Sequence, residues 1–373
     1  MKRVLIIIGT RPEAIKLAPV VHALLRRSSS FDVRVCLTGQ HREMLYQAIE
    51  HFDIPHHYDL QLMKDNQTLA EITASLVTHL DTVISQLNPH VILVQGDTTS
   101  ACIGSLAGFY RKVQVGHVEA GLRTDNKYSP FPEEMNRRLV GVLADYHYAP
   151  TERAKQALLR EGVVSSSIFI TGNTVIDALQ FTLAKIEEQR LPLGDLENIL
   201  DSSKRTILVT GHRRENFGKG FQDICAAIRR LALMFPEVTI VYPVHLNPNV
   251  QKPVYSILGN LPNVHLIQPL PYVPFVRVMK MAHIILTDSG GIQEEATALG
   301  KPVLVMRETT ERQEAIDAGS AILVGTNTEN IFNHAATLIN DNGAWERMNK
   351  ISSPFGDGSA AERIAEHLER IPD

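Results

Sequence analysis

The chain has 373 residues and a formal net charge of −4, with 37 Lys and Arg against 41 Asp and Glu. Hydrophobic residues make up 44% and charged residues 21%, an ordinary globular composition that argues against intrinsic disorder. The mild acidity disfavours a nucleic-acid-binding protein, whose phosphate contacts usually leave a basic excess. The length exceeds what one typical core absorbs, so we expect two domains.

The cysteines and the apolar runs indicate the cellular compartment of the protein. Cys36, Cys102 and Cys225 are too few for a disulfide framework and lie in apolar segments, which favours buried thiols in a reducing compartment. The apolar run at the N-terminus stops at Gly9, too early for a signal peptide, and no stretch approaches the ~18 apolar residues of a membrane span. We therefore expect a soluble, cytoplasmic protein without membrane contact.

Short runs rich in Val and Ile alternate with longer helical patterns, and this alternation occurs twice along the chain. Runs this apolar suit strands covered on both faces, as in a parallel sheet flanked by helices. In the first half the predicted strands are residues 4–8, 33–37, 91–94, 113–118 and 168–170. In the second half they are residues 207–210, 238–244, 264–267, 284–287, 303–306 and 322–324. This alternation predicts two doubly wound α/β domains.

Periodic segments between these runs predict the helices. Residues 69–87 and 220–233 are expected to be crossover helices, and residues 360–370 a last amphipathic helix. The stretch 182–204 is largely polar and shows no strand pattern, so the passage between domains is expected near residues 171–201. We expect an N-terminal Rossmann-like domain over 1–170 and a C-terminal one over 171–355.

Charged residues and glycines follow several predicted strands, at the edge where open α/β sheets bind ligands. After the first strand, Gly9 and Thr10 turn into a helix, and Arg11 and Lys16 place two cations near its N-terminus. Cations oppose the helix dipole there unless an anion is bound, so the segment predicts an anion site. It is not a Gly-x-Gly-x-x-Gly fingerprint, and a nicotinamide cofactor is not expected.

Three further strand ends in the first half carry candidate acids and bases. Asp97 follows the strand at 91–94, where it either caps the next helix or takes part in chemistry. Glu119 follows the strand at 113–118 between glycines, a half-desolvated setting that suits acid–base use. Glu133 and Glu134 open a helix after a loop with two prolines, and the helix dipole alone accounts for one of them.

In the second half, the strand at 207–210 is followed by His212 and Arg213, which favour phosphate contact over a solvated turn. His245 also follows a strand, but a lone histidine is more often structural. After the strand at 284–287, the segment Ser289-Gly290-Gly291 opens a helix and offers bare N–H groups to a phosphate.

Two more residues extend that candidate phosphate site. Glu295 lies about one turn further into the helix, placed to accept hydrogen bonds from ribose hydroxyls, and Arg312 adds a cation after the next strand. The sequence contains no metal-ligand pattern, no Gly-x-Ser-x-Gly nucleophile motif and no Walker lysine motif. We therefore expect neither a metal nor a cofactor.

Nine short segments stand together in one order along the chain. They are Gly-Thr-Arg-Pro-Glu-Ala-Ile-Lys (9–16), Gln-His-Arg-Glu-Met (40–44), Gly-Asp-Thr-Thr (96–99), His-Val-Glu-Ala-Gly-Leu-Arg-Thr (117–124), Ser-Pro-Phe-Pro-Glu-Glu (129–134), Thr-Gly-Asn-Thr-Val-Ile-Asp (171–177), Thr-Gly-His-Arg-Arg-Glu (210–215), His-Leu-Asn-Pro-Asn (245–249) and Asp-Ser-Gly-Gly-Ile-Gln-Glu-Glu (288–295). In this order they closely resemble the non-hydrolysing UDP-N-acetylglucosamine 2-epimerases. Each motif alone is weak evidence for this family, but nine motifs in the same order over almost the whole chain make the resemblance specific.

The resemblance implies a glycosyltransferase-B-like fold, with the substrate between two Rossmann-type domains and residues 356–373 forming a helix that crosses back to the first domain. It implies a homodimer that interconverts UDP-N-acetylglucosamine (UDP-GlcNAc) and UDP-N-acetylmannosamine (UDP-ManNAc) without NAD or metal, for surface polysaccharide synthesis. The family route eliminates UDP to 2-acetamidoglucal and adds it back after protonation from the opposite face. Two acid–base groups on opposite faces of the sugar are therefore required.

Site residues carry over by position. Asp97, Glu119 and Glu133 match the family's carboxylates, while Lys16 and His212 match positions that steady the departing diphosphate. The expected UDP contacts are Arg11, Phe275 beside the uracil, Ser289, Gly290, Gly291, Glu295 and Arg312. A second, activating UDP-GlcNAc site is matched by Gln40, His41, Glu134, Arg213 and His245.

Departures from the family pattern leave alternatives open. Leu270 stands where the family generally has a polar residue near the uracil, and Thr297 and Gln313 replace common prolines. The alternatives are a hydrolysing epimerase that releases ManNAc and UDP, and an epimerase of a modified UDP-diacetamido sugar. A glycosyltransferase shares the fold, but three carboxylates around the sugar exceed what simple transfer needs. A catalytically silent nucleotide-sugar sensor would be expected to lose an acid–base group.

Overall fold

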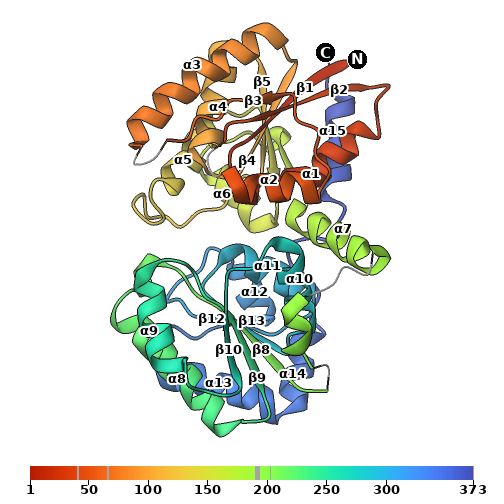
Figure 1. The fold of residues 1–373 in the computed structure, drawn as a ribbon. Coiled ribbons are helices and arrows are strands. Elements are labelled where there is room, and N and C mark those ends of the chain that lie inside the picture. Colours follow the sequence, from red (N-terminus) through yellow and green to blue (C-terminus); the bar gives the residue numbers. More distant parts are fainter. Residues whose placement is uncertain (40–41, 65–66, 190–193, 202, 373) are drawn as a thin grey trace. The chain divides into compact units, whose positions relative to one another are not determined.

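A computed structural model describes residues 1–39, 42–64, 67–189, 194–201 and 203–372. The chain divides into two compact units: the first comprises Met1–Phe181 and Phe355–Asp373, and the second Thr182–Pro354 (Figure 1). Residues 171–181, which the sequence places in the C-terminal domain, therefore group with the first unit. Each unit contains one parallel sheet with helices packed against it.

The first unit is built on a seven-stranded parallel sheet in the order β3-β2-β1-β4-β5-β6-β7. Its strands are β1 (Lys2–Ile8), β2 (Phe31–Leu37), β3 (Tyr58–Asp59), β4 (Val91–Gln95), β5 (Gln114–Val118), β6 (Tyr146–Ala149) and β7 (Ile168–Ile170). Its helices are α1 (Arg11–Leu25), α2 (Arg42–His51), α3 (Leu69–Leu87), α4 (Thr99–Tyr110), α5 (Glu133–Leu143), α6 (Glu152–Arg160) and α15 (Ala360–Arg370), with a 3-10 turn η1 (Ser165–Ser167). The boundary between units falls inside α7 (Thr174–Gln189).

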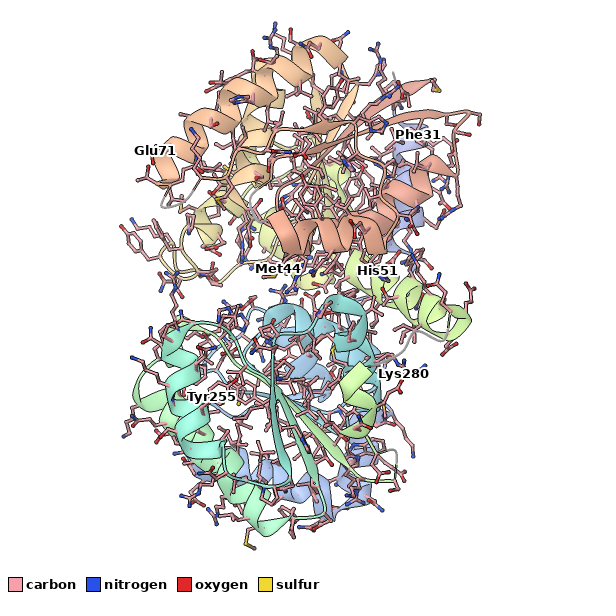
Figure 2. All side chains as sticks on the ribbon, viewed as in Figure 1. Phe31, Met44, His51, Glu71, Tyr255 and Lys280 are labelled. Atoms are coloured by element: carbon pink, nitrogen blue, oxygen red, sulfur yellow. The ribbon has the colours of Figure 1, made fainter. Side chains whose placement is uncertain are left out.

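Helix α3 shows how the sequence sets an element. Thr68 and Glu71 form a reciprocal capping box at its start, and Asn88 ends it in the left-handed conformation. Figure 2 labels Glu71 in this first turn. The helix buries one apolar face, including Leu76 and Leu80, and each buried leucine contributes about 1.5–3 kcal/mol of burial free energy. The predicted bounds, 69–87, are confirmed.

The C-terminal helix α15 packs against α1 within the first unit, and Figure 1 shows this blue helix beside red α1. Lys2 Nζ donates to the Leu368 carbonyl at 2.9 Å, which satisfies an orphan acceptor in the last turn of α15. At its other end, Asp177 Oδ1 accepts the Ala361 N–H at 2.9 Å. Burial raises the pKa of Asp177 to about 6. The chain's two ends are therefore joined by polar contacts as well as by packing.

The second unit is built on a six-stranded parallel sheet in the order β10-β9-β8-β11-β12-β13. Its strands are β8 (Thr206–Thr210), β9 (Thr239–Pro243), β10 (Val264–Ile267), β11 (Ile284–Thr287), β12 (Val303–Val305) and β13 (Ala321–Leu323). Its helices are α8 (Lys219–Met234), α9 (Pro248–Leu258), α10 (Tyr272–Met281), α11 (Gly290–Ala298), α12 (Gln313–Ala318), α13 (Thr328–Asn340) and α14 (Asn342–Asn349), with 3-10 turns η2 (Gly194–Asn198) and η3 (Arg214–Asn216). Phe221, Tyr242 and Leu286 lie fully buried in its core.

The predicted α/β fold class is confirmed, and every predicted strand is present within a residue or two of its expected bounds. The sequence missed β3, which has only two residues, and β6, whose Tyr-His-Tyr-Ala sequence is not an apolar run. The three cysteines are free and buried, as expected. Within the described ranges, no helix combines the length and apolar character that a membrane crossing requires.

Candidate active site

Polar residues gather where the strand order of each sheet reverses. In the first unit this switch point lies between β1 and β4, and in the second between β8 and β11. Ligands of open α/β sheets bind at the carboxyl ends of strands at such points. The segments singled out in the sequence, from Gly9, Asp97, His212 and Ser289 onward, all begin there.

Glu119 is buried, hydrogen-bonded and in an unusual backbone conformation. It follows β5 and is 7% exposed, with φ at +65°, a conformation that costs a non-glycine residue about 1–2 kcal/mol. Its Oε2 accepts from Lys16 Nζ at 2.5 Å and also from the Gln95 side-chain amide. The structure therefore pairs two predicted site residues, Lys16 and Glu119, which the sequence did not predict as partners, and adds Gln95, which was not predicted.

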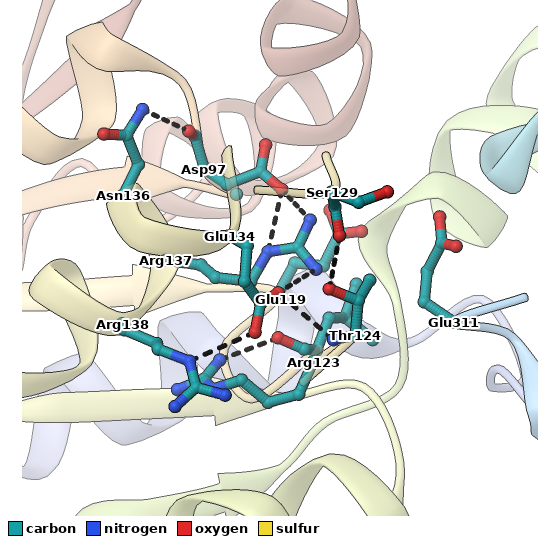
Figure 3. A network of polar contacts seen from close by, with 12 residues as sticks. Asp97, Glu119, Arg123, Thr124, Ser129, Glu134, Asn136, Arg137, Arg138 and Glu311 are labelled. Carbon is teal, nitrogen blue, oxygen red and sulfur yellow. Dashed lines mark hydrogen bonds and ion pairs between the residues drawn. The ribbon is translucent and has the colours of Figure 1, made fainter. Parts of the chain in front are cut away.

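Asp97 lies in a separate network of ion pairs at the end of β4, drawn in Figure 3. Its Oδ2 accepts from Arg137 Nε at 3.1 Å and from a second nitrogen of that guanidinium, while the Asn136 amide donates to the Asp97 carbonyl at 2.9 Å. Arg137 also reaches Glu134 at 3.4 Å. Helix α5 thus holds the loop that carries Asp97.

Glu134 and Glu133 are neighbours with different environments. Glu134 is fully buried and accepts from Arg138 Nε at 3.1 Å and from the Thr124 N–H at 3.1 Å. It therefore ties α5 to the loop after β5. Glu133, the first residue of α5, is partly exposed, and its carboxylate makes no hydrogen bond or ion pair with the residues that the structure describes. Of the two carboxylates, the one of Glu133 therefore has no bonding partner among the described residues.

Glu13 was not predicted as a site residue. It is nevertheless 1% exposed and bonds to the turns next to two predicted residues, Lys16 and Asp97. Its carboxyl group accepts from the Gly9 N–H at 3.1 Å and from the Thr10 and Thr98 hydroxyls at 2.8 Å each. Burial raises the pKa of Glu13 to about 7, although these donors act in the opposite direction. Glu13 joins the turn that leads to Lys16 with the turn that carries Asp97.

His117 supports the same turn from β5. Its Nε2 lies 2.8 Å from the Gly96 carbonyl, and because a carbonyl only accepts, Nε2 carries the proton. Burial lowers the pKa of His117 to about 3, so the ring is neutral at physiological pH. Gly96 has φ at +69°, which glycine adopts without strain. This histidine therefore positions the loop before Asp97.

In the second unit, Asp288 anchors the loop that carries His212. It follows the last residue of β11 and is fully buried. Its Oδ2 accepts the backbone N–H groups of His212 and Arg213 at 2.9 Å each, and the Asn216 amide at 3.3 Å. One carboxylate oxygen therefore fixes the chain after β8 against the end of β11.

The N-terminus of α11 has two glycines with different roles. A Cβ at Gly290 would lie 2.8 Å from Glu311 Oε1 and 3.2 Å from Arg312 Cζ, too close for any other residue without rearrangement. A Cβ at Gly291 would meet nothing within 4 Å. Gly290 therefore allows the arginine to pack beneath the helix start, and Gly291 leaves space beside N–H groups that can bind an anion.

Arg312 is 5% exposed and lies within a buried ion network. Its Nε donates to Glu294 at 2.7 Å, and Nη1 donates to Glu311 at 3.0 Å. Glu311 also accepts from Arg307 at 2.9 Å. Burial would raise the pKa of Glu311, but Arg312, Arg307 and Arg213 outweigh it and hold that pKa well below its usual range. The carboxylates of this network were not predicted.

Two of the remaining predicted UDP contacts lie on neighbouring helices of the second unit, α10 and α11. Glu295 is 6% exposed and accepts from the Tyr272 hydroxyl at 2.6 Å, which connects it to α10. Phe275 is partly exposed one turn further along α10. Arg11 is the first residue of α1 in the other unit and is partly exposed. The structure thus brings Glu295 and the helix of Phe275 together within the second unit.

Two residues predicted for the activating site lie beside His212. The His245 ring stacks on the His212 ring with centroids 5.5 Å apart and planes 19° apart, and Arg213 Nε donates to the Asp288 carbonyl at 3.2 Å. Gln40 and His41 lie outside the described residues. Across the described ranges, no three His, Cys, Asp or Glu side chains are grouped so that they could hold a metal ion.

Each unit has a parallel sheet flanked by helices, with charged residues at the switch point. This architecture defines a two-domain α/β protein of the glycosyltransferase-B-like type. A sequence profile described as UDP-N-acetylglucosamine 2-epimerase matches residues 23–369. The chain belongs to this family.

Proteins similar to this chain match it over nearly its whole length. The chain is 53% identical over 370 residues to the UDP-N-acetylglucosamine 2-epimerase of Yersinia pestis and 52% identical over 370 residues to that of Escherichia coli K12, covering 98% of every chain compared. The structure of the Neisseria meningitidis UDP-GlcNAc 2-epimerase bound to UDP-GlcNAc gives a TM-score of 0.94 at 48% identity, covering 99% of this chain and 100% of that one. The Methanocaldococcus jannaschii enzyme in complex with UDP-GlcNAc and UDP gives 0.82 at 33% identity, covering 99% of each chain.

Proposed function

We propose that this protein interconverts UDP-GlcNAc and UDP-ManNAc by inversion at C2, without hydrolysis and without a metal or nicotinamide cofactor. The observation that carries the proposal is the buried Glu119 carboxylate, held by Lys16 and Gln95 at the end of β5. Identity of about 50% over nearly the full length to enzymes named for this reaction supports the same class.

The chemistry explains why acid–base groups and cations are both needed. The C2 proton is not acidic, because no carbonyl lies next to it. Breaking the C1–O bond sends its electron pair to UDP and builds positive charge at C1, so a carboxylate can then take the C2 proton. The C2–H electrons form the C1–C2 double bond of 2-acetamidoglucal. Protonation at C2 from the opposite face and return of UDP to C1 give the epimer.

We assign the proton transfers to the carboxylates of Asp97, Glu119 and Glu133. Lys16 and His212 stabilise the negative charge that develops on the departing diphosphate. The second unit binds UDP through the start of α11, with Ser289, Gly290 and Gly291 at the phosphates. Glu295 receives the ribose hydroxyls, while Arg11, Phe275 and Arg312 complete the UDP contacts. The open space at Gly291 supports this assignment of the phosphates.

Product analysis tests the proposal. The purified protein is incubated with UDP-GlcNAc, and the products are separated by anion-exchange chromatography and identified by mass spectrometry. The proposal predicts a stable mixture of UDP-GlcNAc and UDP-ManNAc, reached equally from either side. Release of free ManNAc and UDP would identify a hydrolysing enzyme instead. If UDP-GlcNAc binds but stays unchanged, a UDP-diacetamido sugar becomes the substrate to test, and Leu270 the residue to examine.

We further propose that the active protein is a cytoplasmic homodimer that supplies ManNAc-type sugars for surface polysaccharides. An apolar face on the first unit suits contact with a second copy. Met135, Leu139 and Val142 lie at helical spacing on α5 and are exposed, Val142 by 85%, and Phe109 and Val142 line the same hollow. Light scattering after size exclusion tests this: a dimer is expected, and Val142→Glu should give a monomer. Leu233→Glu, on the exposed face of α8 in the second unit, should leave the dimer intact.

Substrate activation is a separate proposal. Arg213 and His245 lie beside His212, and together with Gln40, His41 and Glu134 they match a second UDP-GlcNAc site of the family. Initial rates with UDP-ManNAc as substrate, with and without trace UDP-GlcNAc, test this. Activation by UDP-GlcNAc that is lost in His245→Ala would support the second site, and rates independent of UDP-GlcNAc would contradict it.

A further inference from the structure

One oxygen of Asp288 is not used in anchoring the loop after β8. Oδ2 takes all three of the loop's donors, from His212, Arg213 and Asn216. Oδ1 is buried and has no hydrogen-bond partner among the described residues. It lies 3.4 Å from Nδ1 of the His212 ring, slightly beyond a good hydrogen bond. A buried carboxylate oxygen without a donor is costly, so this geometry calls for an explanation.

We propose that Asp288 is a positioning residue for the leaving-group step: its Oδ1 holds a proton on Nδ1 of His212 and directs Nε2 toward the diphosphate. The proposal rests on the proposed function, in which His212 meets UDP. The carboxylate of Asp288 thereby has two roles: Oδ2 fixes the loop, and Oδ1 orients the His212 ring.

The chemistry of the two groups supports this assignment. A carboxylate oxygen only accepts, so the ring nitrogen facing Oδ1 must carry hydrogen. When Nε2 is also protonated, the ring becomes a cation, and the adjacent carboxylate stabilises that form. The imidazolium then donates from Nε2 to a phosphate oxygen, a charge-assisted hydrogen bond. The His212 side chain is 42% exposed while Asp288 is fully buried, so the ring has one edge against Asp288 and retains access to solvent.

The other charged and titratable groups around the ring do not replace Asp288. Arg213 is a cation and disfavours a charged ring, but its guanidinium lies 3.8 Å from Glu311, which offsets it. His245 stacks face to face with His212 and fixes the plane of the ring. The carboxylate oxygen that the structure places against Nδ1 is therefore Oδ1 of Asp288.

Asp288→Asn separates the two tasks. The amide oxygen can still accept the three donors that Oδ2 accepts, so the loop keeps its anchor. The amide nitrogen then faces Nδ1 of His212 and donates to it, which requires an unprotonated Nδ1 and favours the neutral ring. A merely structural role for Asp288 predicts little change in this variant.

The test uses the full chain and follows the His212 ring by NMR as a function of pH in the ligand-free protein, with His212→Gln to assign the signal. Asp288→Asn should lower the pH midpoint of His212 titration by about one unit or more. The control is Asn216→Ala, which also removes a contact to Asp288 but leaves Oδ1 untouched, and its midpoint should stay with that of the unsubstituted protein. An unchanged midpoint in Asp288→Asn would overturn the proposal.

Kinetics then connect the ring to the reaction. Asp288→Asn should lower kcat about 10- to 100-fold with a smaller effect on KM, because the lost charge matters most as the diphosphate departs. Equal kcat in Asp288→Asn and the unsubstituted protein would refute the leaving-group role even if the midpoint shifts. A protein that shows the shifted midpoint but neither binds UDP nor turns over any UDP-sugar would contradict the proposed function rather than the contact between Asp288 and His212.

Discussion

At the scale of single residues, the predicted acid–base groups are held by partners that the sequence does not reveal. Glu119 depends on Lys16 and Gln95, and Asp97 depends on Arg137. Each of these carboxylates is thus compensated by donors, as burial of charge requires. Substitutions at these positions therefore act on chemistry and stability together, and the two effects need separate measurements.

Glu119→Gln keeps the size of the side chain and removes the proposed base. We expect turnover to fall by about two to four orders of magnitude, the usual contribution of a general base, while UDP-sugar binding is largely retained. Steady-state kinetics and calorimetric titration with UDP-GlcNAc measure the two effects. Glu161→Gln, which alters a carboxylate paired with Arg123 instead, is the control. Persistent turnover in Glu119→Gln would remove Glu119 from the proton transfers.

Glu13 predicts a pH dependence of stability. Its pKa is about 7 in the folded protein against 4.5 as the ordinary value, so the folded state binds the proton more tightly. The free energy of unfolding should therefore fall as pH rises from 4.5 to 7, by at most ~3 kcal/mol from this group. Glu13→Gln lacks this loss, so its stability relative to the unsubstituted protein should improve between about pH 5 and pH 8 in guanidinium unfolding. A constant difference would show that Glu13 does not titrate in this range.

At the scale of elements, strands buried on both faces could be predicted from the sequence because their apolar runs are continuous, as in β1 and β11. Strand β6 was missed because its burial is achieved by aromatic and histidine side chains, with Tyr148 fully buried. The strand ends pointed to Asp97, Glu119 and Ser289 because ligand residues follow strands. Partners such as Glu13 and Asp288 could not be inferred, because their contacts join segments about 80 residues apart.

The start of α11 gives a prediction at this scale. Gly290→Ala should lower the free energy of unfolding of the second unit by about 1–3 kcal/mol, because its Cβ must displace Glu311 or Arg312 from their ion pairs. Gly291→Ala meets open space and should raise it by up to about 1 kcal/mol, as alanine favours a helix. Denaturant unfolding of both variants gives the comparison. Equal losses at the two positions would contradict close packing at Gly290.

At the scale of the whole molecule, the first unit is completed by the far end of the chain. Helix α15 buries Ala361, Ile364 and Leu368, and Lys2 binds the carbonyl of Leu368. The sequence predicted the helix from its periodicity, but periodicity does not say what an amphipathic face will cover. That choice depends on contacts between residues more than 300 positions apart, which a local pattern does not contain.

Ile364→Ala tests this dependence. The side chain is fully buried, so its truncation should cost about 2–5 kcal/mol, although it lies far from the sheet in sequence. Urea unfolding measures the loss, with Glu366→Ala on the exposed face of α15 as the control, expected within about 0.5 kcal/mol of the unsubstituted protein. Similar effects from the two substitutions would mean that α15 does not bury Ile364 against the first unit.

In the proposed mechanism, a carboxylate breaks and remakes the C2–H bond of the sugar. Proton NMR of the protein with UDP-GlcNAc in D2O measures this directly. Solvent deuterium should appear at C2 of UDP-ManNAc as it forms, and then at C2 of the returning UDP-GlcNAc. Formation of UDP-ManNAc with protium retained at C2 would contradict proton exchange through Asp97, Glu119 or Glu133, and with it the acid–base roles assigned to these three carboxylates.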